Sequence, residues 1–286
     1  MRIACFALLE PFTPMRRQFE IIREMGFEYA DLTDNHDGAT LGTEYGFAAS
    51  FSLDSHPGTI RDLVREFGLT LVSVCAHANL LDPTAPDRYG THEIIKAIKL
   101  AHFLGVKQVI TAEGEPRTAF GRSLSHAQRV FSVCEKLHEP IRWAEEFGLE
   151  LLIEPHGMLT DSVEGMGNLL EELGHEKTVG INLDTGNVWI GGGEPLDFVR
   201  VFGSRIRHVH WKDMPAAWEP QRGKIFGCGM SAIPLGDGLV GVESVVDALR
   251  GIGFNGFSTL EVAGRDNMRI SAQRLRAWTS KELSTI

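Results

Sequence analysis

The chain has 286 residues, of which 43% are hydrophobic, and a formal net charge of −10 at pH 7. The excess of acid disfavours a nucleic-acid partner, which needs a basic surface, and no apolar run reaches the roughly 18 residues that span a membrane. The N-terminal MRIACFALLEPF lacks the apolar core and cleavage site of a signal peptide, so we expect a cytoplasmic location. The four cysteines are scattered without a CxxC pair, which predicts core residues rather than zinc ligands or disulfides.

Apolar segments alternate with amphipathic segments along the whole chain. We predict strands at 2–8, 27–32, 69–76, 106–112, 149–155, 178–184, 206–211 and 257–263. We predict helices at 15–26, 59–68, 92–105, 126–148, 162–174, 195–203, 242–253 and about 266–282. The strands are nearly continuously apolar, which is typical of parallel strands covered by helices.

Four of the predicted helices end in the same way, with a glycine followed closely by a strand: EMGFEYADL, EFGLTLVSV, FLGVKQVI and EFGLELLIE. Glycine in this place is typical of a left-handed helix C-cap. Eight strand–helix units predict an α/β fold, a single-domain (β/α)₈ TIM barrel over residues 1–286. A doubly wound open sheet is the alternative, but no GxGxxG motif follows the first strand.

Polar residues stand at the ends of the last four predicted strands: Glu154, Asp184, His210 and Glu261. Catalytic residues of a barrel come from these strand ends. Any one of these acids alone is explained by a cap or a salt bridge, but the whole set predicts a shared site. Facing carboxylates repel one another unless a cation lies between them, and carboxylate and imidazole ligands suit Mn²⁺, Mg²⁺, Co²⁺ or Zn²⁺. His208 lies one layer deeper on the same strand face, where we expect a hydrogen-bonded core histidine.

Four segments carry a resemblance to a known family: IEPHG (153–157), NLDTGN (182–187), RIRHVHWKD (205–213) and TLEVAG (259–264). They resemble the xylose isomerase-like barrel superfamily of sugar phosphate isomerases and epimerases, which includes ketose 3-epimerases and inosose dehydratase. The resemblance implies one divalent metal ion, with Mn²⁺ preferred. It also implies that Glu154, Asp184, His210 and Glu261 bind the metal, and that Glu154 and Glu261 act catalytically by exchanging the substrate proton.

The chain departs from the ketose 3-epimerases at two places. Asn187 stands where those enzymes place a substrate-binding histidine, and Ala216 stands near the position of their arginine. Our candidates for substrate binding are five residues near the strand ends: His77, Glu113, His156, Asn187 and Lys212. For His77, Glu113 and His156 a structural role is the open alternative, and for Lys212 it is a salt bridge to an acid such as Asp213.

These patterns predict a metal-dependent isomerase or epimerase that removes a proton next to a carbonyl of a small keto-sugar or polyol. The alternative is a metal-dependent lyase or dehydratase, similar to inosose dehydratase or to enzymes that cleave 3-keto-glycosides and C-glycosides. The LGDG segment (235–238) is similar to segments of the inosose dehydratase group. We expect a small sugar as substrate, no nucleic-acid or membrane partner, and a homo-oligomer or a small partner subunit.

Overall fold

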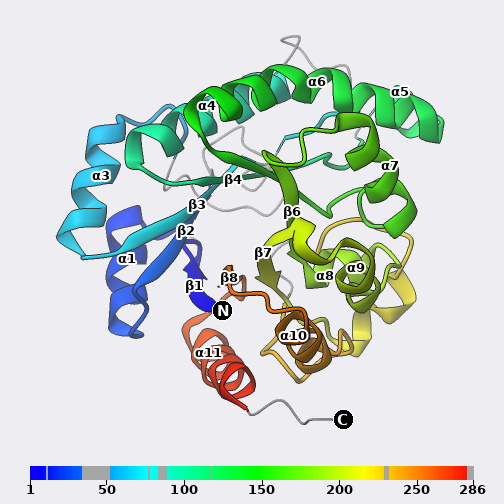
Figure 1. The fold of residues 1–286 in the computed structure, drawn as a ribbon. Coiled ribbons are helices and arrows are strands. Elements are labelled where there is room, and N and C mark those ends of the chain that lie inside the picture. The colour runs from blue at the N-terminus through cyan, green and yellow to red at the C-terminus, as the bar shows by residue number, and fades with distance from the viewer. Residues whose placement is uncertain are drawn as a thin grey trace.

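Eight parallel strands form the centre of the molecule in the computed structural model, which describes residues 1–10, 12–33, 52–76, 78–82, 89–116, 118–228 and 232–281. They close into a barrel in chain order, with helices around them (Figure 1). The strands are β1 (Arg2–Phe6), β2 (Tyr29–Thr33), β3 (Thr70–Ala76), β4 (Gln108–Ala112), β5 (Glu150–Glu154), β6 (Val179–Asp184), β7 (Ile206–Trp211) and β8 (Phe257–Leu260). The prediction of a (β/α)₈ barrel is confirmed.

The eight predicted helices are all present around the barrel. They are α1 (Met15–Glu24), α3 (Pro57–Glu66), α4 (Tyr89–Leu104), α6 (His126–Phe147), α7 (Val163–Leu173), α9 (Pro195–Phe202), α10 (Val242–Gly251) and α11 (Arg265–Ser280). Four short segments escape prediction because they are too short to show a periodicity: α5 (Ala119–Ser123), α8 (Thr185–Ile190), η1 (Gly203–Arg205) and η2 (Ala216–Gln221). Within the described ranges, no helix is both long enough and apolar enough to cross a membrane.

The glycines predicted to end four helices all have positive φ angles. Gly148, for example, caps α6 with a φ of 62° and a ψ of 41°. A residue with a side chain is strained in this left-handed conformation, whereas glycine is not. These glycines therefore let the chain reverse from a helix directly into the next strand.

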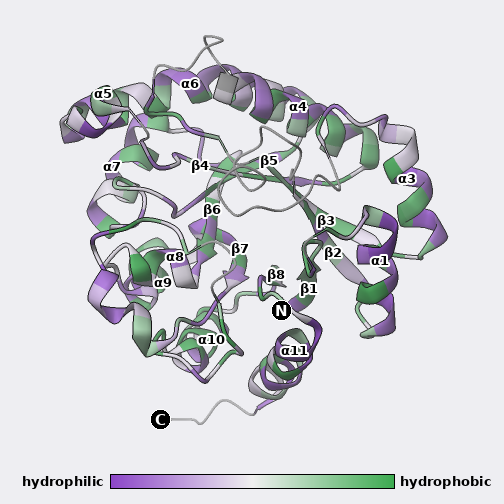
Figure 2. Cartoon of the chain, turned by 180° about the vertical axis from the view of Figure 1, so that it is seen from behind, coloured by the Kyte–Doolittle hydropathy of each residue, from purple (hydrophilic) through white to green (hydrophobic). Residues whose placement is uncertain are grey.

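Apolar side chains pack between the strands and the surrounding helices, and polar residues concentrate on the outer helix faces (Figure 2). A second apolar cluster contains Phe6, Leu8, Cys75, Ile110 and Leu152. The register of the strands then aligns the polar positions, because Asp184 of β6 is paired with His210 of β7, which is paired with Thr259 of β8. Residues at the ends of three consecutive strands therefore lie side by side.

Candidate active site

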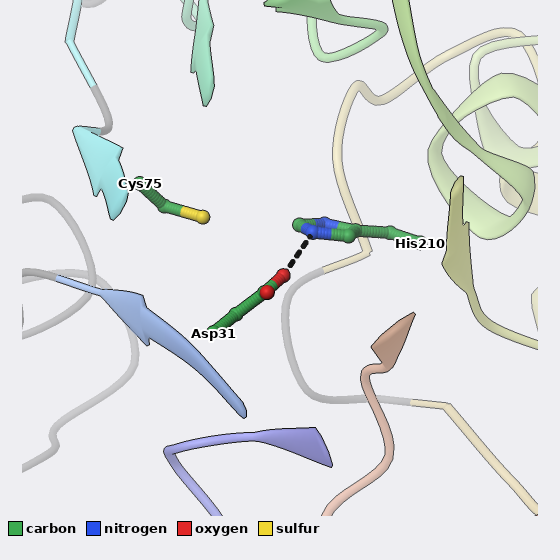
Figure 3. Close-up of side chains that lie close together, drawn as sticks. All are labelled: Asp31, Cys75 and His210. Atoms are coloured by element: carbon green, nitrogen blue, oxygen red, sulfur yellow. Dashed lines mark hydrogen bonds and ion pairs between the residues drawn. The ribbon is translucent and has the colours of Figure 1, made fainter. Parts of the chain in front are cut away.

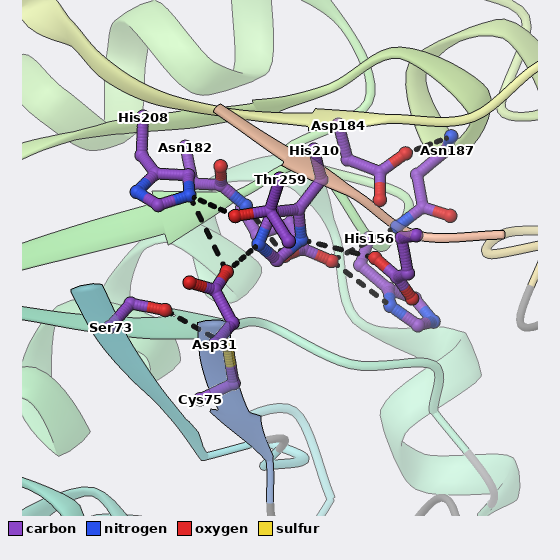
Figure 4. Close-up of polar contacts among 12 residues, drawn as sticks. Asp31, Ser73, Cys75, His156, Asn182, Asp184, Asn187, His208, His210 and Thr259 are labelled. Carbon is purple, nitrogen blue, oxygen red and sulfur yellow. Dashed lines mark hydrogen bonds and ion pairs between the residues drawn. The ribbon is translucent and has the colours of Figure 1, made fainter. Parts of the chain in front are cut away.

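The structure brings the four predicted metal ligands together at the carboxyl ends of β5 to β8. Glu154 and Asp184 end their strands, His210 is the penultimate residue of β7, and Glu261 directly follows β8. All four are buried. One ligand atom from each of Glu154, Asp184 and His210 lies within 4.8 Å of the other two, and Figure 4 shows the labelled Asp184 and His210 in this cluster.

His210 lies between the two glutamates. Its Nδ1 atom is 3.1 Å from Glu154 Oε2 and 3.1 Å from Glu261 Oε2. Neither contact has the geometry of a hydrogen bond, so Nδ1 has no hydrogen-bond partner within the described part of the chain. Asp184 Oδ2 has no partner in that part of the chain besides the ammonium of Lys212, which lies 2.8 Å away. Buried polar atoms are nearly always hydrogen-bonded, so an imidazole nitrogen that faces two carboxylate oxygens without a hydrogen bond indicates a ligand site.

A lysine adjoins this cluster from the end of β7. Lys212 is buried, and its Nζ atom lies 2.8 Å from Asp184 Oδ2 and 2.9 Å from Glu261 Oε1. Lys212 thus forms salt bridges to acids, as the structural alternative predicts, but not to Asp213, which accepts hydrogen bonds from backbone N–H groups instead. Burial opposes the charge of the ammonium, but the charges of Asp184 and Glu261 raise the pKa of Lys212 well above its ordinary value.

The pKa values of Asp184 and Glu261 are shifted in opposite directions. Burial raises the pKa of Asp184 to about 7, although Lys212 pulls it down. Burial acts on Glu261 in the same direction, but Lys212 and His210 together outweigh it and hold the pKa of Glu261 below its ordinary value. With Glu154, the three carboxylates exceed the single ammonium by two negative charges when all are ionised.

These features fit a divalent cation. The site offers carboxylate oxygens and an imidazole nitrogen, a ligand set that suits Mn²⁺, Mg²⁺, Co²⁺ or Zn²⁺. Its three buried carboxylates outnumber its one buried ammonium, so a cation between them would offset their mutual repulsion. Glu154, Asp184, His210 and Glu261 are the residues that would hold the metal.

Two asparagines that flank Asp184 hold the carboxylate of Glu154. Asn182 Nδ2 donates to Glu154 Oε2 over 2.8 Å, and Asn187 Nδ2 donates to Glu154 Oε1 over 3.1 Å. The Asn187 Oδ1 atom accepts hydrogen bonds from the backbone N–H and the thiol of Cys228. The amide of Asn187, a candidate for substrate binding, therefore joins Glu154 to the loop after β7.

Of the other substrate candidates, His156 lies at the site. Its Nδ1 atom is 4.0 Å from Glu154 Oε1, and a Cβ atom built on Gly227 would be 2.1 Å from its Nε2 atom, so the loop after β7 lies against the ring. Glu113 is engaged elsewhere, because its carboxylate accepts hydrogen bonds from the backbone N–H groups of Leu159 and Thr160. His77 lies outside the described residues.

Asn182 and Asp31 lie at the site without a sequence motif that marks them. Asn182 precedes Asp184 by two residues, so strand alternation alone places it on the same face. Asp31 lies on β2, where a charged residue in an apolar strand is the available signal. His208 is the hydrogen-bonded core histidine that we predict, with Nδ1 2.8 Å from Gln108 Oε1 and Nε2 2.8 Å from Thr259 Oγ1.

Residues 19–281 match the family described as "Xylose isomerase-like TIM barrel". The chain belongs to this family. Two similar curated members are 3-dehydroshikimate dehydratase of Bacillus anthracis and inosose dehydratase of Geobacillus kaustophilus. The first is 24% identical over 65% of this chain and 67% of its own length. The second is 26% identical over 60% of this chain and 59% of its own length.

Solved structures of the xylose isomerase-like family share the fold along almost the entire chain. A D-tagatose 3-epimerase-like protein has a TM-score of 0.74 and 19% identity, with 97% of each chain covered. The IolI protein, described with a bound zinc atom, has a TM-score of 0.74 and 14% identity, with 100% of each chain covered. The named relatives therefore include both dehydratases and an epimerase-like protein, and one of them binds a metal ion.

Proposed function

We propose that this protein is a metal-dependent dehydratase that removes a proton next to a carbonyl of a keto-sugar or keto-cyclitol and then eliminates water. The observation that carries the proposal is the convergence of Glu154 and Glu261 on the same Nδ1 atom of His210, with Lys212 against Glu261. The dehydratase names of the similar curated proteins support the choice of elimination over epimerisation.

A bound divalent ion, for which we propose Mn²⁺, would supply Lewis-acid stabilisation of negative charge on the carbonyl oxygen of the substrate. Glu154 is the proposed base. Both of its oxygens accept an amide N–H, from Asn182 and Asn187, which holds the carboxylate in one orientation. A base held in this way needs little reorganisation before it takes the proton.

Glu261 and Lys212 act at the leaving hydroxyl in this proposal. As the C–H bond breaks, its electron pair forms the C=C bond and the C–O bond breaks, so the departing oxygen needs a proton and nearby positive charge. An ammonium has three N–H donors, and Asp184 and Glu261 account for two at Lys212. The third is assigned to the leaving oxygen, which takes this proton from Lys212 and departs as water. The proton that Glu154 has taken from carbon then restores the ammonium, so that the cycle releases one water and no net proton. His156 is assigned to another hydroxyl of the substrate.

Epimerisation or isomerisation is the second candidate, and the symmetry of the site favours it. The two glutamate oxygens lie at equal distances, 3.1 Å, from His210 Nδ1. Carboxylates on two sides of one centre can remove a proton from one face of a carbon and return it to the other. This reaction needs no leaving group and leaves the mass of the substrate unchanged.

The test begins with the metal content of the purified protein and of the Glu154→Ala/Asp184→Ala variant. We expect about one divalent ion per chain in the natural protein and none in the variant, with the surface variant Glu146→Ala as a control. The absence of bound metal after loading with Mn²⁺, Co²⁺ or Zn²⁺ would contradict the proposal.

A product assay then separates the two reactions. The metal-loaded protein is incubated with inosose, 3-dehydroshikimate and a panel of keto-hexoses, and the molecular masses of the products are measured by mass spectrometry. A product lighter by one water supports dehydration. A product of unchanged mass that takes up deuterium from D₂O supports epimerisation instead. The homo-oligomer, the absence of a nucleic-acid partner and the cytoplasmic location remain predictions.

A further inference from the structure

A fourth buried acid, Asp31, lies next to the metal-ligand cluster. It comes from β2, is fully buried, and points at the ring of His210 (Figure 3). Its Oδ2 atom is 3.0 Å from His210 Nε2 and 3.4 Å from His208 Nε2. A buried carboxylate is costly unless it is paired, so one of the two histidines is expected to donate a hydrogen bond to Asp31.

The hydrogen bonds of His208 identify its tautomer. Gln108 donates from Nε2 to Glu150 Oε2 over 2.8 Å, which turns Gln108 Oε1 toward His208. Because that oxygen can only accept, His208 Nδ1 carries the proton. The Nε2 atom of the neutral ring is then an acceptor, and the hydroxyl of Thr259 donates to it. His208 therefore has no proton to offer Asp31.

The donor to Asp31 is accordingly Nε2–H of His210. A histidine that binds a metal ion is neutral, and a neutral imidazole carries a proton on only one nitrogen, so in the metal-bound protein this bond leaves the lone pair on Nδ1. The Nδ1 atom faces the Oε2 atoms of Glu154 and Glu261. Phe6 packs edge-on against the His210 ring, with 5.7 Å between the ring centroids. Ring orientation and tautomer both follow from contacts that lie away from the carboxylate cluster.

We infer that Asp31 is a positioning residue for the metal site, which fixes His210 as the Nε2–H tautomer so that Nδ1 binds the ion. Carboxylates that accept the second N–H of a metal-bound histidine orient the ring and raise its basicity. The inference rests on the proposed function, because it assigns Asp31 to the metal that Glu154, Asp184, His210 and Glu261 would hold.

A rival assignment is a separate metal site made by Asp31, Cys75 and His210, whose ligand atoms also lie within 4.8 Å of one another. His210 Nε2 cannot both donate a proton to Asp31 and offer a lone pair to a second ion. Cys75 also belongs to the apolar cluster with Phe6, Leu8, Ile110 and Leu152, and its thiol is in hydrogen-bond contact with Ser73 Oγ at 3.7 Å. The positioning role therefore accounts for the contacts better than a second ion does.

The test compares Asp31→Asn with Thr259→Val and Cys75→Ala, and measures the Kd of Co²⁺ and Mn²⁺ by calorimetry. An asparagine has the shape of Asp31 but lacks its charge, and its amide can turn to donate to Nε2 and move the ring proton to Nδ1. We expect metal affinity to fall about 10- to 100-fold in Asp31→Asn. Thr259→Val alters only the His208 side of the network and should bind metal like the natural protein, as should Cys75→Ala.

The outcomes separate this inference from the proposed function. If the natural protein binds no metal, the proposed function fails. If the natural protein and Asp31→Asn bind metal equally well, only the role of Asp31 is overturned. A loss of affinity in Cys75→Ala equal to that in Asp31→Asn would overturn it in favour of the rival site.

A second measurement does not depend on the folding of a variant. In the natural protein, long-range ¹H–¹⁵N spectra report which ring nitrogen of each histidine carries the proton. We expect the zinc-loaded protein to show His210 protonated at Nε2 with Nδ1 shifted by the metal. A proton on Nδ1, or a metal shift on Nε2, would overturn the inference.

Discussion

Two aspartates near the ends of neighbouring strands are equally buried but have different partners. Asp213, two residues after β7, accepts hydrogen bonds from four backbone N–H groups: those of Met214, Gly236, Gly238 and Val240. Asp184, at the end of β6, accepts one backbone N–H, from Asn187, and turns its other oxygen toward Lys212. A carboxylate saturated by backbone N–H groups holds a loop, whereas one that faces other charged groups is available to a ligand.

Glu113 belongs with Asp213 in this comparison. It directly follows β4, whose last residue, Ala112, is paired with Glu154, yet its oxygens accept backbone N–H groups of the loop after β5. Burial and position at a strand end are therefore shared by both classes of acid. The partners of the carboxylate oxygens distinguish the site from the scaffold.

The largest expected effect comes from Glu261→Gln, which keeps the shape of the side chain but removes the carboxylate. We expect kcat to fall about 10²- to 10⁴-fold, the usual contribution of a general acid or base. The rate is measured on the substrate found in the screen, with circular dichroism as the check of folding. Full activity in this variant would mean that Glu261 has a structural role, like Asp213 and Glu113.

Lys212→Met tests whether the ammonium balances the carboxylates. Removing one partner from a buried ion pair costs about 3–5 kcal/mol, so the metal-free variant should unfold at a clearly lower urea concentration. A saturating divalent ion should recover more stability in the variant than in the natural protein, because it replaces the lost charge. The matched control is Lys96→Met, whose partly exposed pairs with Asp54 and Glu93 should contribute about 0–1 kcal/mol.

A pair of variants sharpens the contrast between the two aspartates. Asp213→Asn leaves backbone N–H groups without an acceptor, which should lower the free energy of unfolding by about 1–3 kcal/mol without changing metal affinity. Asp184→Asn should do the opposite, with a loss of metal binding as the main effect. Both quantities are measured on each variant. Equal metal affinity in the two variants would remove the distinction.

The smallest effect concerns pH. Burial raises the pKa of Glu113 to about 7, against the pull of the backbone N–H groups of Leu159 and Thr160. The folded protein therefore keeps a proton that the unfolded chain has already lost, and unfolding releases it. Stability from this group is present below the ordinary pKa of a glutamate and is lost as the pH rises through about 7.

The Glu113→Gln variant removes this titration. Between pH 5 and pH 8 we expect the melting temperature of the natural protein to fall by a few degrees more than that of the variant. Glu146→Gln, a change at an exposed glutamate, serves as the control. Parallel melting curves for all three proteins would contradict the raised pKa of Glu113.

The sequence by itself was sufficient for the barrel and for the grouping of the metal-ligand candidates. Strand and helix periods are local, as are the glycines that end the helices, such as Gly148. A parallel barrel brings the carboxyl ends of all its strands to one face. The proximity of Glu154, Asp184, His210 and Glu261 can therefore be predicted before any of their contacts is known. These conclusions need only the order of residues along each strand.

The tertiary structure alone decided which partner each polar side chain takes. Lys212 adjoins Asp213 in sequence but pairs with Asp184 and Glu261, and Asn187 donates a hydrogen bond to Glu154, 33 positions before it. Asp31 precedes His210 by 179 positions, yet Asp31 Oδ2 lies 3.0 Å from His210 Nε2. Hydrogen bonds and ion pairs depend on differences of an ångström between strands that are distant in sequence, and no periodicity within a strand records such distances.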